Sequence, residues 1–191
     1  MKRWSPQSGF VLRAAICSVA GFGALAVAGC GRQAAAPVPP PALAPVTARD
    51  LLEKVQDARG DVVLVSVWAT WCDPCRHEFP ALLRLRRELA GRRFRLILVS
   101  ADFADQQSKV LQFLAQQGVA FPTYLKAEQD MSFINTLDSR WSGALPATFL
   151  FDDAGKLRDF WEGEASYENL VGKVKALLGS VLERGVEGGS P

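Results

Sequence analysis

The chain has 191 residues, of which 49% are apolar and 22% are charged, a composition typical of a globular protein. This length predicts one domain with extensions, large enough to bury a core without disulfide staples. Three of the 22 basic residues precede Cys30, so 19 basic residues face 20 acidic ones in the remaining chain. Such a balance excludes binding to nucleic acid through a basic surface.

The N-terminus has the pattern of an export signal. Lys2, Arg3 and Arg13 are basic, and an apolar run over 14–28 follows Arg13. This run is too short and too rich in Gly and Ala for a membrane span. We therefore predict a secretory signal peptide over residues 1–29.

A cysteine follows this apolar run. The sequence LAVAGC places small residues before Cys30 and resembles the lipobox of bacterial lipoproteins. We expect Cys30 to be lipidated; the alternative is cleavage after the AVA at 26–28, which leaves it unmodified. Residues 30–45 then form a lipidated N-terminus and a Pro/Ala-rich tether. The expected location is the cell envelope, facing the periplasm and anchored by lipid to the inner or outer membrane.

The elements beyond the tether alternate between helices and strands, as periodicity and turn residues indicate. The prediction is a helix over 47–59, a buried strand over 61–68, a helix over 74–90 containing Pro80, a second buried strand over 94–101, a helix over 104–118, a short strand over 120–125, one or two helical turns over 131–138, a hairpin over 147–163 and a closing helix over 166–183. This order predicts a central sheet with helices on both faces, in a domain spanning 46–180. Residues 181–191 are expected to form a disordered tail.

A close pair of cysteines lies where the first buried strand gives way to a helix. Cys17 lies in the signal peptide and Cys30 in the lipobox, so Cys72 and Cys75 are expected to pair with each other in an oxidising compartment. The N–H groups and partial positive charge of a helix N-terminus favour a thiolate at Cys72. Cys75 lies about one turn on and deeper. The pair predicts thiol–disulfide exchange, in which Cys72 attacks and Cys75 resolves the mixed disulfide.

Other uses of the pair fit less well. A structural disulfide closing so short a loop gives little entropic stabilisation. Zinc needs four ligands, and haem attachment needs C-x-x-C-H, whereas His77 stands one residue too far along. We therefore expect no metal and no cofactor.

The segment VSVWATWCDPCRHEFP resembles the active site of thioredoxin-fold proteins of the TlpA/ResA type, a group that includes cytochrome c maturation reductases. The shared pattern W-C-x-P-C-x-x-E-x-P is matched by Trp71, Cys72, Pro74, Cys75, Glu78 and Pro80. The resemblance covers about 46–179. It implies an α/β thioredoxin fold, a central mixed sheet flanked by helices, with a TlpA-like strand–helix insertion at about 103–125.

The resemblance gives Glu78 a role. In the family, a glutamate at this position helps to manage the protons of the cysteine pair. Glu78 lies one helical turn after Cys75, on the same face, and a carboxyl whose pKa is raised by burial can take the proton from Cys75. The alternative is an exposed residue paired with an arginine. Ser66 stands where many thioredoxins carry a buried aspartate, which favours Glu78 as the proton partner.

A second segment is expected to bind substrate. GALPATFL resembles the family's cis-proline loop, with Pro146 as the cis-proline and Leu145 offering its backbone to an extended substrate. An ordinary trans-proline is the alternative. Trp68 is expected in the core. The full set of expected substrate-contacting residues is Trp71, Asp73, Pro74, Leu145 and Pro146.

Asp73 bears on the direction of electron flow. Its carboxylate opposes a Cys72 thiolate by about 1 kcal/mol, which roughly cancels the contribution of the helix terminus. Strong oxidants depend on a stabilised reduced form, so this balance favours a reductase.

The expected function is a membrane-tethered thiol–disulfide oxidoreductase that reduces disulfides of exported proteins, with cytochrome c maturation as one candidate pathway. Expected partners are a disulfide-containing exported protein and a membrane electron donor of the DsbD or CcdA kind, and the chain is expected to be a monomer. A peroxiredoxin-like peroxidase and a non-catalytic thioredoxin-like binding module are the alternatives. A Sco-type copper module is disfavoured, because no histidine follows His77.

Overall fold

A computed structural model describes the chain from residue 41 to residue 187, with side chains as far as residue 181. The predicted signal peptide, Cys30 and most of the predicted tether lie outside the described residues. The elements are β1 (Leu43–Val46), α1 (Ala48–Asp57), β2 (Val62–Trp68), α2 (Asp73–Glu88), β3 (Phe94–Ser100), the 3₁₀ turn η1 (Ala104–Gln106), α3 (Gln107–Gln116), β4 (Thr123–Lys126), α4 (Asp130–Leu137), β5 (Ala147–Phe151), β6 (Leu157–Glu162) and α5 (Tyr167–Glu187).

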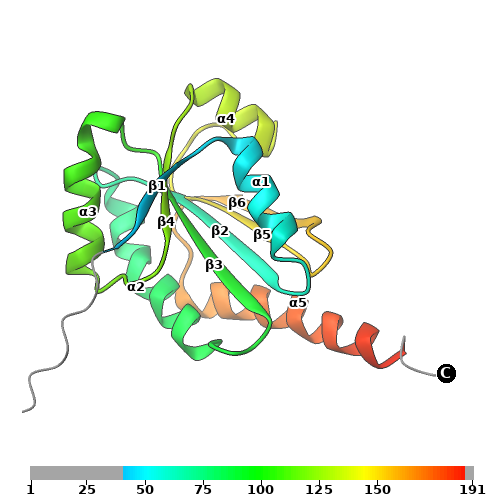
Figure 1. Ribbon diagram of the computed structural model, residues 1–191. Helices are drawn as coiled ribbons and strands as arrows, with labels where there is room; N and C mark the ends of the chain where they lie inside the picture. The colour runs from blue at the N-terminus through cyan, green and yellow to red at the C-terminus, as the bar shows by residue number, and fades with distance from the viewer. Residues whose placement is uncertain (1–40, 188–191) are drawn as a thin grey trace, which may run out of the picture. The chain divides into compact units, whose positions relative to one another are not determined.

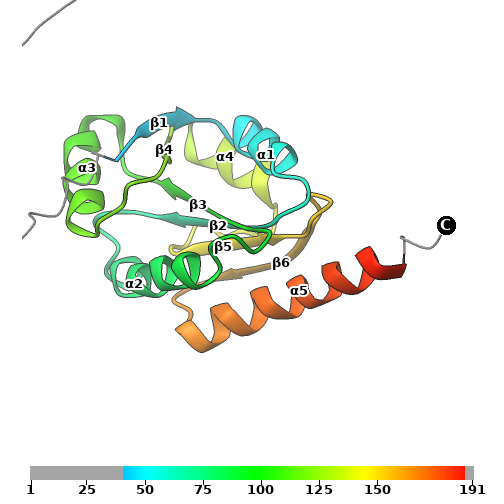
Figure 2. The same ribbon diagram turned by 60° about the horizontal axis from the view of Figure 1, so that its bottom comes forward.

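The strands form one mixed sheet in the order β1-β4-β3-β2-β5-β6. The pairs from β1 to β2 are parallel, whereas β5 runs antiparallel to both β2 and β6. Helices α1 and α4 cover one face, while α2 and α5 cover the other (Figures 1 and 2). The prediction of a thioredoxin fold with a mixed, helix-flanked sheet is confirmed.

The central strand β2 explains why the sheet needs cover on both faces. All seven of its residues are buried, because Val62, Leu64 and Trp68 pack under α2 while Val63, Val65 and Val67 pack under α1 and α4. A β-branched run of this kind is typical of a strand with helices on both sides.

The predicted strand–helix insertion is present. After β3 the chain forms η1 and α3 and returns as β4, which lies in the sheet between β3 and β1. Gly118 ends this helical segment with a φ of +69°, a left-handed conformation that glycine adopts without strain. The insertion therefore adds a strand next to the one that follows the cysteine helix.

The two ends of the domain differ from the prediction. Residues 43–45, expected in the tether, belong to β1, where Leu43 pairs with Thr123. Because β1 is an edge strand, it tolerates Pro45, which lacks an N–H group. At the other end α5 runs on to Glu187, and Val181 is buried like Leu170 on the same helix.

Within the described residues, no helix has the length and apolar character needed to cross a bilayer.

Candidate active site

The cysteine loop is built at the junction of β2 and α2. Cys72 is the N-cap of α2, and its sulfur accepts a hydrogen bond from the N–H of Cys75 at 3.2 Å. Pro74 lies in the first turn, where its missing N–H costs nothing. The helix therefore begins at the first cysteine, and its free N–H groups face that sulfur.

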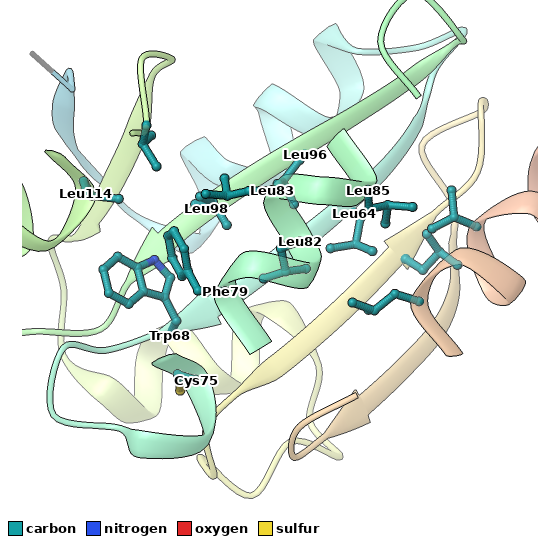
Figure 3. Packing of buried hydrophobic residues seen from close by; sticks show 14 of the residues in the cluster. Leu64, Trp68, Cys75, Phe79, Leu82, Leu83, Leu85, Leu96, Leu98 and Leu114 are labelled. Carbon is teal, nitrogen blue, oxygen red and sulfur yellow. The ribbon is translucent and has the colours of Figure 1, made fainter. Parts of the chain in front are cut away.

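Cys72 and Cys75 form a disulfide, with 5.3 Å between their Cα atoms. Cys72 is 6% exposed and Cys75 is 1% exposed, so the prediction that Cys75 lies deeper is confirmed. Figure 3 shows Cys75 at one end of the core cluster, next to Trp68. Cys72 is therefore the more accessible of the two cysteines to a reaction partner.

A cluster of aromatic rings packs in the core next to the cysteine loop. Trp68 lies 4.8 Å from Phe79, and both rings lie 5.0 Å from Phe113, measured between ring centroids. Trp68 and Phe79 are fully buried (Figure 3). The prediction of Trp68 as a core residue is confirmed, and the cluster fixes both the end of β2 and the start of α2.

Asp102 ties the cysteine loop to the neighbouring strand. Its carboxylate accepts hydrogen bonds from the Thr70 N–H at 2.9 Å, the Thr70 hydroxyl at 2.5 Å and the Ser100 hydroxyl at 2.7 Å. Asp102 is not among the predicted site residues. The available signal was a polar residue directly after a buried strand, since β2 and β3 are parallel and pair Trp68 with Ser100.

Glu78 lies in α2, one turn beyond Cys75, and is 2% exposed. Neither carboxylate oxygen has a hydrogen-bond partner of regular geometry within the described residues, although the Ala165 backbone lies close enough to favour the charged form. Burial raises the pKa of Glu78 to about 7; the Ala165 backbone opposes this rise and the charge of Glu164 adds to it. The alternative of an exposed glutamate paired with an arginine is wrong.

The loop between β6 and α5 completes the surroundings of Glu78. It carries Glu164, whose Oε2 lies 3.9 Å from Nδ1 of His77. His77 is largely exposed and faces this acidic residue. Glu164 acts on Glu78 from 86 positions away in the chain, and no local pattern in the sequence indicates this contact.

The Leu145–Pro146 peptide bond is cis, as predicted. Pro146 directly precedes β5, whose first residue pairs with Val67 near the end of β2, so this loop and the cysteine loop share one end of the sheet. The loop is held by the Trp141 indole, which donates to the Ala144 carbonyl at 2.9 Å. Leu145 is half-buried, and neither its N–H nor its C=O has a partner among the described residues.

The remaining predicted residues lie on the surface beside Cys72. Trp71 is 64% exposed, and Pro74 is exposed in the first turn of α2. Asp73 is exposed and pairs with Arg76 at 3.5 Å, an interaction that the sequence analysis did not include. This pair reduces the effect of the Asp73 charge on Cys72.

The described part of the chain contains no cluster of His, Cys, Asp and Glu side chains that could hold a metal ion.

A mixed sheet with a C-x-x-C disulfide at a helix N-terminus, beside a cis-proline loop, defines the class of thioredoxin-fold thiol–disulfide oxidoreductases. The model of the AhpC/TSA family matches residues 46–160. The chain belongs to this family and, within it, to the TlpA/ResA type.

Known relatives agree with this assignment. The chain is 30% identical over 124 residues to the thiol-disulfide oxidoreductase ResA of Bacillus thuringiensis (strain Al Hakam), covering 65% of this chain and 68% of that protein. It is 29% identical over 141 residues to the thiol:disulfide interchange protein HelX of Rhodobacter capsulatus, covering 73% and 70%.

A solved thioredoxin-family thiol:disulfide interchange protein from Chlorobium tepidum TLS has the same fold, with a TM-score of 0.57 and 24% identity over 76% of this chain and 99% of that one. The chain is a thiol–disulfide oxidoreductase.

Proposed function

We propose that the chain is a membrane-tethered protein-disulfide reductase of the cell envelope. The observation that carries this proposal is the cysteine pair itself: Cys72 caps the N-terminus of α2, Cys75 lies deeper, and the buried Glu78 carboxyl lies one helical turn beyond Cys75. A stable structural disulfide needs no proton acceptor, whereas a cycling dithiol does.

The proposed cycle has three steps. The Cys72 thiolate attacks one sulfur of a substrate disulfide, and the other substrate sulfur leaves as a thiolate that takes up a proton. Cys75 passes its proton to ionised Glu78 and attacks the sulfur of Cys72, which expels the second substrate thiolate and closes the disulfide between Cys72 and Cys75. A membrane dithiol donor of the DsbD or CcdA kind supplies two electrons and two protons to restore the reduced pair.

The reducing direction is supported by the surroundings of Cys72. Among the described residues, its sulfur accepts one backbone N–H and no bond from a cationic side chain, and the nearby Arg76 is paired with Asp73. Strong oxidants owe their potential to a stabilised reduced form. The tether is supported by the basic and apolar N-terminus and by the small residues before Cys30.

Insulin reduction tests the enzymatic part of the proposal. The wild-type full chain is expected to precipitate insulin B chain in the presence of dithiothreitol, and Cys72→Ala is expected to fall to the uncatalysed rate. Equal turnover by wild type and Cys72→Ala would refute the reductase. Faster consumption of hydrogen peroxide than of insulin would favour a peroxidase.

Cell fractionation tests the tether separately. The wild-type chain is expected in the membrane fraction and Cys30→Ser in the soluble fraction, with unchanged insulin reduction. Metabolic labelling with an alkyne fatty acid is expected to mark wild type and not Cys30→Ser; labelling of neither would overturn lipidation.

A further inference from the structure

Three large apolar side chains project into solvent at the end of the sheet that carries the cysteine pair. Of the large apolar side chains that the structure describes, Trp71, Phe103 and Met131 are the exposed ones, at 64%, 68% and 65%. They follow the ends of β2, β3 and β4, which are adjacent and parallel in the sheet. Three neighbouring strands therefore each present one apolar residue at the end of the sheet where Cys72 lies.

These residues are linked to one another. The hydrogen bonds from Thr70 to Asp102 join the loop of Trp71 to that of Phe103. Phe103 and Met131 line one cleft of about 680 Å³, and Asp102 belongs to the same lining. We call this cleft, with Phe103 and Met131 as its large apolar side chains, the apolar cleft. It lies at the carboxyl ends of β3 and β4 and adjoins the cysteine loop through Asp102, which Thr70 binds.

The charged side chains that line the apolar cleft are engaged elsewhere. Lys126 pairs with Asp130 and donates to the Glu128 carbonyl. Glu128 accepts from the N–H of Ala48 at 2.6 Å and from the hydroxyl of Ser132 at 3.0 Å. The carboxylate of Asp102 is bound by Thr70 and Ser100, as described above. Each charged group of the lining therefore has a partner within the chain, and the lining keeps two more acidic than basic groups beside its apolar side chains.

We propose that the apolar cleft binds the polypeptide segment next to the reactive cysteine of a disulfide substrate, with one apolar side chain seated between Phe103 and Met131. This proposal rests on the proposed function. Because Asp102 joins the cleft to Thr70, two residues before Cys72, the residues that flank a cysteine bound at Cys72 can reach the cleft, which favours a polypeptide over a lipid surface. The Leu145 loop precedes β5, on the opposite side of β2, so cleft and loop hold the substrate on both sides of its cysteine.

Paired peptides test this assignment. Two otherwise identical peptides, each with one cysteine activated as a mixed disulfide with thionitrobenzoate, carry either Leu or Ser at the positions flanking the cysteine. The reduced full chain reacts in two steps. Cys72 attacks the peptide sulfur and releases thionitrobenzoate; Cys75 then attacks Cys72 and releases the peptide thiol, so that two electrons pass from the dithiol to the mixed disulfide.

The wild-type chain is expected to react about tenfold faster with the Leu peptide, as burial of one Leu-sized side chain implies. The double variant Phe103→Ser with Met131→Ser is expected to lose this preference and to keep the wild-type rate with 5,5′-dithiobis(2-nitrobenzoate), which has no peptide segment. The matched control is Phe121→Ser, because Phe121 lines a different cleft with Asp61 and Gly91, at the opposite end of β2 and β3.

A Leu preference that persists in the double variant overturns the proposal, as does an equal loss of rate with the small disulfide. Reduced binding of the double variant to phosphatidylglycerol vesicles, with the Leu preference unchanged, would make the cleft a membrane contact instead. Failure of the proposed function gives another result, since neither peptide would then react faster with wild type than with Cys72→Ala.

Discussion

The cysteine loop is flanked by two buried carboxylates in different surroundings. Asp102, after β3, is 1% exposed and accepts three hydrogen bonds from two side-chain hydroxyls and a backbone N–H. Glu78, in α2, is 2% exposed and has no hydrogen-bond partner of regular geometry within the described residues. The two carboxylates are similarly buried, but only that of Asp102 is held by several hydrogen bonds.

A third buried carboxylate shows which arrangement serves structure. Asp152, in the hairpin far from the cysteines, accepts from the N–H groups of Ala154 and Lys156 and pairs with Arg158. These hydrogen bonds lower the pKa of Asp152 despite the opposing effect of its burial. Like Asp152, Asp102 accepts several hydrogen bonds from nearby groups, whereas Glu78 does not. Burial of Glu78 outweighs the one backbone group, that of Ala165, that favours its charged form, so a raised pKa one helical turn from a redox cysteine points to proton transfer.

The largest expected effect on turnover comes from substitution of the cysteines, whose loop is flanked by Asp102 and Glu78. Cys75→Ala is expected to retain attack by Cys72 but to stop at the mixed disulfide, since no second thiol can release the product. Turnover of insulin should fall at least a thousandfold, on the order of removing an essential nucleophile. Mass spectrometry should show the chain covalently joined to substrate, whereas Cys72→Ala should show no adduct. Adducts on both variants would mean that either sulfur can attack.

Removal of the Asp102 carboxylate should have the next largest effect, on the stability of the fold. Asp102→Ala leaves the Thr70 N–H and two hydroxyls without their acceptor, and we expect the free energy of unfolding to fall by about 3 kcal/mol. Urea unfolding of the oxidised chain measures this. Asp105→Ala, at an exposed neighbouring site, serves as the control. A loss for Asp102→Ala no greater than for this control would contradict the anchoring role.

Glu78→Gln should have the opposite effect on stability above neutral pH. With a pKa of about 7 in the folded chain against 4.5 in a model compound, Glu78 keeps a proton that the unfolded chain has lost. The wild type therefore loses stability as pH rises from about 4.5 to 7, and Glu78→Gln does not. The variant should gain on the order of 2 kcal/mol over wild type across this window, allowing for partial solvation of the site.

The same substitution should slow the step in which Cys75 releases the product, by about 10- to 100-fold, because the proton acceptor is lost. Stopped-flow measurement of product release across pH 5 to 9 compares the variant with wild type. Glu53→Gln, at an exposed position of α1, is the control. Unchanged release with raised stability would make Glu78 a buried acid without a role in the reaction.

The smallest effect is expected at Asp73. Asp73→Asn should raise the rate of Cys72 alkylation by iodoacetamide by less than tenfold, because it removes an exposed charge that Arg76 already offsets. Arg76→Gln should lower the rate by a similar factor. Effects of the same sign for both variants would show that this ion pair acts on Cys72 through structure and not through charge.

Sequence reasoning succeeded where the signal was local. The buried strand predicted over 61–68 is β2, and the helix predicted from residue 47 is α1, whose first turn carries a capping box of Thr47 and Asp50. The order of depth of Cys72 and Cys75 follows from one helical turn. These features depend on residues within a few positions of one another, where period and capping act directly.

Contacts that depend on strand register or on distant loops were not predicted from the sequence. The bonds between Thr70 and Asp102 exist because β2 and β3 align Trp68 with Ser100, which no local pattern fixes. Glu164 reaches Glu78 only once α5 docks on α2. Strand β1 was missed because four residues with a proline carry no strand period, and its partner β4 comes from the insertion.

The reduction potential of the Cys72–Cys75 couple, measured on the full chain by equilibration with defined ratios of reduced to oxidised dithiothreitol and glutathione, tests the central claim most directly. We expect a fully reversible transition near that of thioredoxin, about −270 mV. A value near −120 mV, typical of a strong oxidant, or a disulfide that stays closed in excess dithiothreitol, would contradict a cycling reductase.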